Sequence, residues 1–76
     1  MIDWLELGGA CKRIRKERGW SADLLAAKAG CHRTTVYRLE RCEPVSMASL
    51  QLVFVALGIE LRVDARMSVL SDVAPN

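Results

Sequence analysis

The sequence predicts a small all-α domain of four helices, followed by a short C-terminal β-strand. Three observations predict this fold class. Apolar residues recur at three- and four-residue steps as far as Leu57, which is helical spacing. Serines and glycines that suit helix starts and helix ends divide this stretch into segments. After Gly58 the apolar residues alternate with charged ones, which is strand spacing.

The length and composition favour one folded intracellular domain. The chain has 76 residues, of which 51% are hydrophobic, and its net charge is only +2. We find no signal peptide and no apolar run near the ~18 residues of a membrane span. The three cysteines form no CxxC pair, so we expect no disulfide framework and a reducing, cytoplasmic location.

The first helix is expected from Leu5 to Arg18. Its inward face follows helical spacing and consists of Trp4, Leu7, Cys11 and Ile14. Gly8 and Gly9 weaken its start, because glycine is a poor helix former, and Gly19 ends it. Its second half, "KRIRKER" from Lys12 to Arg18, has five basic residues and one acid.

The second helix is short. Ser21 suits its N-cap, and Asp23 lies in the first turn, where the helix dipole favours an anion. Gly30 ends it after about two turns. The residues expected to face inward are Leu24, Leu25 and Ala29, with the small Ala26 allowing close helix contact.

The third helix should start near His32 or Arg33 and run to Arg41, because Pro44 bars its continuation. At 100° per residue, the polar side chains share one outward arc of about 140°. Val36 and Leu39 lie on the opposite side. The residues of the arc are Arg33, Thr34, Tyr37, Arg38 and Arg41. This arc is either an ordinary solvated surface or a surface that binds a partner.

The fourth helix is expected from Met47 to Leu57, with Ser46 as its N-cap and Gly58 at its end. Only Ser49 and Gln51 are polar within it, so one buried face cannot absorb its apolar surface.

The strand that follows, Ile59 to Ala65, lacks a partner in an otherwise helical chain. We therefore expect a two-fold homodimer in which these helices pack and these strands pair. The residues expected at the dimer contact are Phe54, Ile59, Leu61 and Val63. The alternative is a monomer whose strand folds back on its own helices. Residues 1–65 would form the domain, and residues 66–76 a flexible tail.

The order of elements favours the second interpretation of the third helix, a surface that binds a partner. A short helix, a tight glycine turn and a second helix with a basic outer face are the pattern of a helix-turn-helix. The stretch from Leu7 to Leu61 resembles the lambda-repressor-like helix-turn-helix family of Cro and phage repressors, the XRE family. The matching residues are Leu7, Ile14, Arg15, Gly19, Ser21, Leu25, Ala26, Gly30, Val36, Leu39, Glu40 and the "ALG" of residues 56–58.

The resemblance implies a transcriptional regulator, most simply a repressor, that binds double-stranded DNA. The third helix would enter the major groove, where its N-terminal residues reach the bases. Arg33 and Thr34 would read base edges, with His32 and Arg38 next. Tyr37, Arg41 and Ser21 would contact phosphates.

The resemblance also implies an ion pair between Arg15 and Glu40 that ties the first helix to the third. The chain departs from the family at three positions. Ala22 replaces a glutamine that meets the DNA backbone, His32 replaces a small polar N-cap, and Cys42 replaces the usual glycine after the third helix.

Other classes of function fit less well. Cys31, His32 and Cys42 suggest a zinc site, but their spacing is not that of a zinc finger, so no metal or cofactor is expected. The single histidine and the lack of a glycine-rich phosphate loop argue against an enzyme. One alternative is an antitoxin, which would bind a toxin protein and autoregulate its operon. A third option is a DNA-binding subunit that recruits an enzyme.

Overall fold

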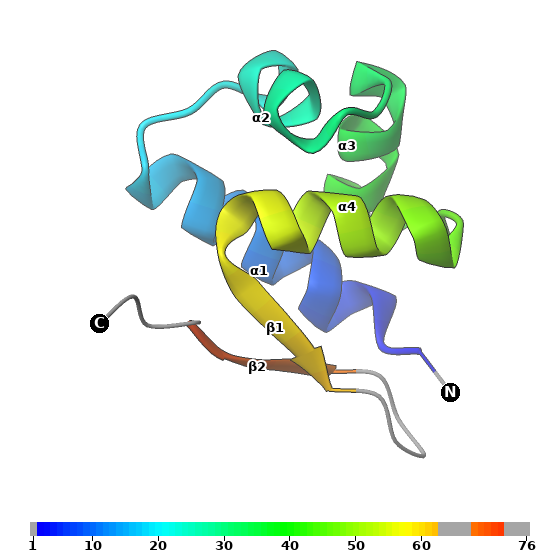
Figure 1. Ribbon diagram of the computed structural model, residues 1–76. Helices are drawn as coiled ribbons and strands as arrows, with labels where there is room; N and C mark the ends of the chain where they lie inside the picture. The colour runs from blue at the N-terminus through cyan, green and yellow to red at the C-terminus, as the bar shows by residue number, and fades with distance from the viewer. Residues whose placement is uncertain (1, 63–67, 73–76) are drawn as a thin grey trace.

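The structure, a computed structural model, describes residues 2–62 and 68–72. Four helices come first: α1 (Trp4–Glu17), α2 (Ala22–Ala29), α3 (Arg33–Glu40) and α4 (Met47–Leu57). Two strands follow, β1 (Ile59–Arg62) and β2 (Ser68–Asp72). The predicted four-helix fold class is therefore confirmed. In Figure 1, α2 and α3 lie on one side of α4, and β1 and β2 lie on the other.

Side-chain caps set the helix starts. Ser21 accepts a hydrogen bond from the Leu24 amide at 3.0 Å, and Ser46 accepts one from the Ser49 amide at 3.1 Å. Both predicted N-caps are thus confirmed. Helix α1 starts one residue earlier than expected, because the Asp3 carboxylate accepts from the Glu6 amide and caps it.

The core is assembled from one face of each helix. Its largest fully buried side chains are Phe54, Leu7, Leu25, Leu39, Leu50, Leu57, Val36, Val53 and Cys11. The expectation that Leu24 faces inward is wrong, since 42% of it is exposed. The inward face of α2 consists of Leu25, Ala26 and Ala29. Leu24 comes one residue before this set, and the turn of the helix places it outside that face.

The expectation of an unpaired strand is also wrong. Strand β1 pairs antiparallel with β2, with Leu61 opposite Val69 and Arg62 opposite Ser68. The backbone groups on that edge of β1 are therefore paired within the chain, by residues of the segment expected to be a flexible tail. The described part of β1 ends at Arg62, and residues 63–65 of the expected strand lie outside the described residues.

Two of the four residues expected at the dimer contact lie in the chain's own core. Phe54 is fully buried and Ile59 is 3% exposed, both within the chain's own core, because their side of α4 and β1 packs on the other helices. Leu61 is half-buried against the same core, and Val63 lies outside the described residues.

Within residues 2–62 and 68–72, no helix is long and apolar enough to cross a membrane.

Candidate nucleic-acid interface

The turn between α2 and α3 sets where the third helix starts. Gly30 adopts a left-handed conformation with φ +75°, which glycine reaches without steric cost, and this closes α2. The His32 ring nitrogen Nδ1 then accepts the Thr34 amide at 3.1 Å. His32 is therefore the N-cap of α3, in place of the small polar residue that is usual there. This use of Nδ1 leaves the His32 ring exposed at the start of the helix.

The outward face of α3 is polar and basic. Val36 and Leu39 are fully buried beneath it and fix the rotation of the helix. The predicted interface residues that the structure leaves exposed are His32, Arg33, Thr34, Tyr37, Arg38 and Arg41. They lie together on α3 and its two caps. Ser21 is exposed at the start of α2, where its hydroxyl oxygen is already used as the N-cap.

Two carboxylates that the sequence reasoning left out of the interface border this face. Asp23, in the first turn of α2, accepts the Tyr37 hydroxyl at 2.5 Å and lies 3.8 Å from Arg33 Nη1. The hydrogen bond to Asp23 raises the pKa of the Tyr37 phenol above its usual value of 10.0. The sequence signal for this contact is the anion in the first turn of α2, which the helix dipole alone would also explain.

Glu43 borders the other end of α3. Its carboxylate accepts from Arg41 Nε at 3.1 Å and lies 3.5 Å from Arg38 Nε. The hydrogen bond from Arg41 lowers the pKa of Glu43. Arg38 also donates to the Pro44 carbonyl at 3.0 Å. All these side chains are about half exposed, so the ion pairs are weak and open to exchange for another anion.

A partly buried ion pair holds α3 in place. Arg15 donates from Nε to Glu40 Oε2 at 2.6 Å and from Nη2 to Glu40 Oε1 at 2.9 Å. Its Nη1 donates to the Trp20 carbonyl at 2.8 Å. The two side chains are only 12% and 11% exposed. Arg15 therefore ties α3 both to α1 and to the connection before α2, which is the pairing that the resemblance implied.

Cys11 is a third member of this cluster that the sequence reasoning counted only as core. Its thiol lies 3.6 Å from Glu40 Oε2 and donates to it. Burial and the negative charge of Glu40 raise the pKa of the Cys11 thiol, so it stays protonated and remains a donor. The buried Glu40 carboxylate is thus satisfied from two directions on α1.

The end of α3 keeps the geometry of a glycine turn without glycine. Cys42 has φ +64°, and among the described residues it is the one non-glycine residue with positive φ. Its amide donates to the Leu39 carbonyl at 2.9 Å, and the Glu43 amide donates to the Arg38 carbonyl at 2.9 Å. These two bonds form a Schellman closure. The bend that the departure at Cys42 put in question is preserved, and it brings Glu43 beside Arg38 and Arg41.

The metal alternative gains nothing from the geometry. Over the residues that the structure describes, no group of three or more histidine, cysteine, aspartate or glutamate side chains is arranged to hold a metal ion. Cys31 packs partly against the core, where burial raises its pKa.

The comparisons with known proteins agree with this arrangement. Residues 12–63 match the protein family described as helix-turn-helix. The chain belongs to this family. It is a helix-turn-helix protein of the XRE type, a DNA-binding family and not a family of enzymes. The chain matches no curated protein and no solved structure. In this helix-turn-helix, α2 is the first helix of the motif and α3 is the helix that presents the basic face.

Proposed function

We propose that this DNA-binding regulator is a repressor that recognises a specific double-stranded sequence as a homodimer, with α3 in the major groove. The observation that supports it best is the outward face of α3. It projects three arginines and a threonine from a helix whose opposite side is fully buried. An α-helix fits the major groove, and arginine and threonine suit base edges and phosphates.

The position of each residue on α3 suggests its contact. Arg33 and Thr34 open the helix beside the exposed His32 cap, which is where recognition helices reach base edges. Arg38 lies one turn further along and is next in line for a base. Arg41, at the far end, is placed for a phosphate. We expect Tyr37 to contact DNA through its ring, because its hydroxyl already donates to Asp23 and a phosphate offers only acceptors.

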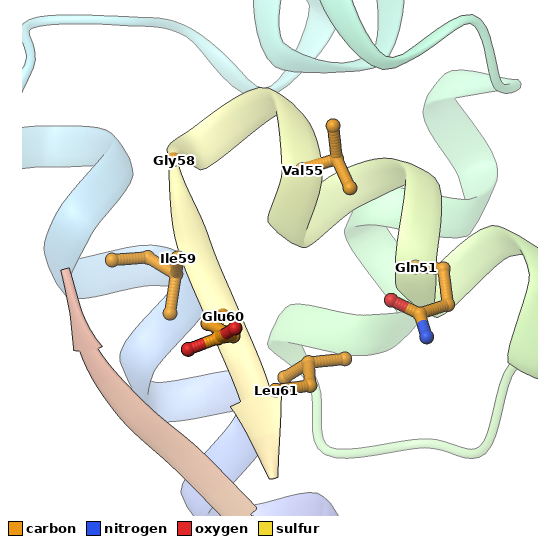
Figure 2. A pocket seen from close by; sticks show the side chains of 6 residues that line it. All are labelled: Gln51, Val55, Gly58, Ile59, Glu60 and Leu61. Atoms are coloured by element: carbon orange, nitrogen blue, oxygen red, sulfur yellow. The ribbon is translucent and has the colours of Figure 1, made fainter. Parts of the chain in front are cut away.

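The homodimer is supported by the apolar surface that α4 leaves open. Met47, Leu52 and Val55 are 43%, 44% and 72% exposed, on the side of α4 that does not pack on the core. Beside Val55 lies a hollow of about 380 Å³. Figure 2 shows its lining residues, which are Gln51, Val55, Gly58, Ile59, Glu60 and Leu61. We assign the exposed side of α4 and this hollow to a second copy, in place of the buried Phe54.

The antitoxin alternative uses the same observations differently. An antitoxin would keep the DNA-binding face of α3 and offer the exposed apolar side of α4 to a toxin. A toxin-sized reading frame beside this one would favour that alternative. A regulator that dimerises through α4 without such a neighbour would favour the simple repressor.

The experiment that tests the proposal is selection of bound sequences from a random duplex library. We expect a palindromic consensus whose half-sites are centred about one helical turn, ~34 Å, apart. Affinity for this consensus duplex should fall steeply with salt, because phosphate contacts release counterions. Enrichment of no sequence, together with a flat salt response, would overturn the proposal.

A substitution places Arg33 within this scheme. Arg33→Ala should weaken binding to the consensus duplex by about 1–3 kcal/mol and relax the preference at one base pair of each half-site. Arg41→Ala, at the far end of the helix, is the matched control and should weaken all sequences alike. A loss for Arg33→Ala that is equal on consensus and scrambled duplexes would move Arg33 to the phosphate contacts.

A further inference from the structure

Asp23 is an anion on a surface that is otherwise shaped for a polyanion. Its two carboxylate oxygens go to two residues one turn apart on α3. Oδ1 accepts the Tyr37 hydroxyl at 2.5 Å, and Oδ2 lies 3.8 Å from Arg33 Nη1. The Asp23 side chain is 55% exposed and the Arg33 side chain is 64% exposed, so neither is buried by the fold. The carboxylate thus sits at the edge of the proposed interface, beside the arginine proposed to read a base.

This position has two consequences for a DNA complex. The Tyr37 hydroxyl has one proton, and while Asp23 accepts it the hydroxyl cannot donate to a phosphate. Arg33 is in a weak, exposed pair, which a better partner can displace. Only Nη1 of Arg33 faces Asp23, so the remaining N–H donors of the guanidinium can meet the two acceptors of a guanine edge while the pair persists. A phosphate brings a negative charge against the Asp23 carboxylate, whereas a base edge is neutral, so Asp23 opposes phosphate contacts, which carry no sequence information, more than base contacts.

We propose that Asp23 is a specificity-determining residue, which holds Arg33 and Tyr37 away from phosphates and so lowers affinity for DNA of the wrong sequence. This inference rests on the proposed function, since it requires that Arg33 reads a base in the correct complex. It is a repulsive element of the kind that specific interfaces combine with attractive contacts. Asp23 acts through Arg33 and Tyr37, so it is a positioning residue.

The test compares two duplexes and three proteins. The duplexes are the consensus selected by the unmodified protein and a scrambled version of it. The variants are Asp23→Asn and, as a matched control, Glu17→Gln. Glu17 also pairs with an exposed arginine, Arg13 on α1, at 3.4 Å, so its substitution changes the net charge equally but away from α3.

We expect Asp23→Asn to bind the scrambled duplex about two- to five-fold more tightly, because an arginine is released from an exposed ion pair. The slope of log affinity against log salt on that duplex should steepen by about 0.9, the value for one added phosphate contact. Affinity for the consensus should change less, so the ratio between the two duplexes should fall. Glu17→Gln should leave that ratio unchanged.

A spectroscopic measurement tests the contact independently of DNA. The chain has one tyrosine, so absorbance of the phenolate near ~295 nm reports on Tyr37 alone. The groups that face it are Asp23 on α2, which raises its pKa, and Arg33 on α3 and Arg15 on α1, which lower it. In the unmodified protein the pKa should lie above 10.0. In Asp23→Asn it should move down, and in Glu17→Gln it should not.

The outcomes separate this inference from the proposed function. If the unmodified protein selects no consensus, the proposed function fails first. If it selects one and Asp23→Asn keeps the same affinity ratio between consensus and scrambled duplexes, Asp23 has no role in specificity. Thermal unfolding of each variant identifies the alternative of a purely structural role at the start of α2, which would lower stability and leave the ratio unchanged.

Discussion

At the scale of single residues, Glu40 is the side chain on which the placement of α3 depends most. It receives two hydrogen bonds from the Arg15 guanidinium and one from the Cys11 thiol, all from α1. Charges that are largely removed from water gain little net stability from pairing, because each has lost much of its hydration. Their effect is on geometry, since the buried carboxylate accepts these donors in only one arrangement of α1 and α3.

Removing the charge of Glu40 should be costly. Glu40→Gln leaves the partly buried charge of Arg15 unbalanced, so we expect a loss of about 3–5 kcal/mol in the free energy of unfolding by urea. Glu17→Gln, which breaks the exposed pair with Arg13 on α1, should cost less than ~0.5 kcal/mol. Replacing both partners with apolar residues, as in Arg15→Met with Glu40→Leu, should recover part of the loss. Equal losses in stability for Glu40→Gln and Glu17→Gln would contradict this account.

At the scale of elements, the adjacent glycines of α1 have opposite roles. A Cβ at Gly8 would lie 2.3 Å from the Leu39 carbonyl oxygen and 3.2 Å from Cys42 Sγ. A Cβ at Gly9 would meet nothing within 4 Å. Gly8 thus allows the backbones of α1 and the last turn of α3 to approach each other. Gly9 only weakens the helix.

This contrast predicts stability changes of opposite sign. Gly8→Ala should destabilise the domain by about 1–3 kcal/mol, because the backbone of α3 must move away. Gly9→Ala should stabilise it by up to ~1 kcal/mol, the helix preference of alanine over glycine at an exposed position. Each kcal/mol corresponds to roughly 4–8 °C in the midpoint of thermal unfolding, which circular dichroism can measure. A shift in the same direction for both variants would show that Gly8 is not a packing position.

The helices were predictable because their signals are local. Ser46 and Gly58 set both ends of α4 from within the helix and its flanks, and the predicted bounds agree with the structure. Strand β2 was not predictable in this way. Residues 68–72, "SVLSD", show no clean alternation, and their extended state depends on β1, a partner set by the fold.

The candidate interface likewise has features that were predictable from local sequence and features that were not. Helical periodicity placed the arginines of α3 on one face, because spacing along one helix is a local property. It did not predict that Asp23 and Glu43 would pair with them. Asp23 reaches Tyr37 only through the packing of α2 against α3, and Glu43 reaches Arg38 only through the left-handed turn at Cys42. Both depend on how elements meet.

At the scale of the whole molecule, the two surfaces proposed for partners belong to different parts of the fold. Helices α2 and α3 occupy one side of α4, and β1 and β2 the other (Figure 1). The hollow beside Val55 lies where α4 meets β1. A two-fold contact here can combine the exposed side of α4 with the part of β1 that borders the hollow. Such a contact leaves the basic face of α3 available to DNA in both copies.

Val55 is the residue at which the homodimer can be tested. It is 72% exposed and borders the hollow, so a dimer contact here would bury its side chain. A glutamate at this position would then place its charge inside the contact. We expect Val55→Glu to weaken dimerisation at least ~30-fold, equivalent to ~2 kcal/mol, as measured by sedimentation equilibrium. Its affinity for the full palindrome should fall toward that for a single half-site. Leu5→Glu introduces the same charge at a 75% exposed leucine of α1 and should remain dimeric. If Val55→Glu dimerises as well as Leu5→Glu, the contact between copies lies elsewhere, and the exposed side of α4 is free for another protein.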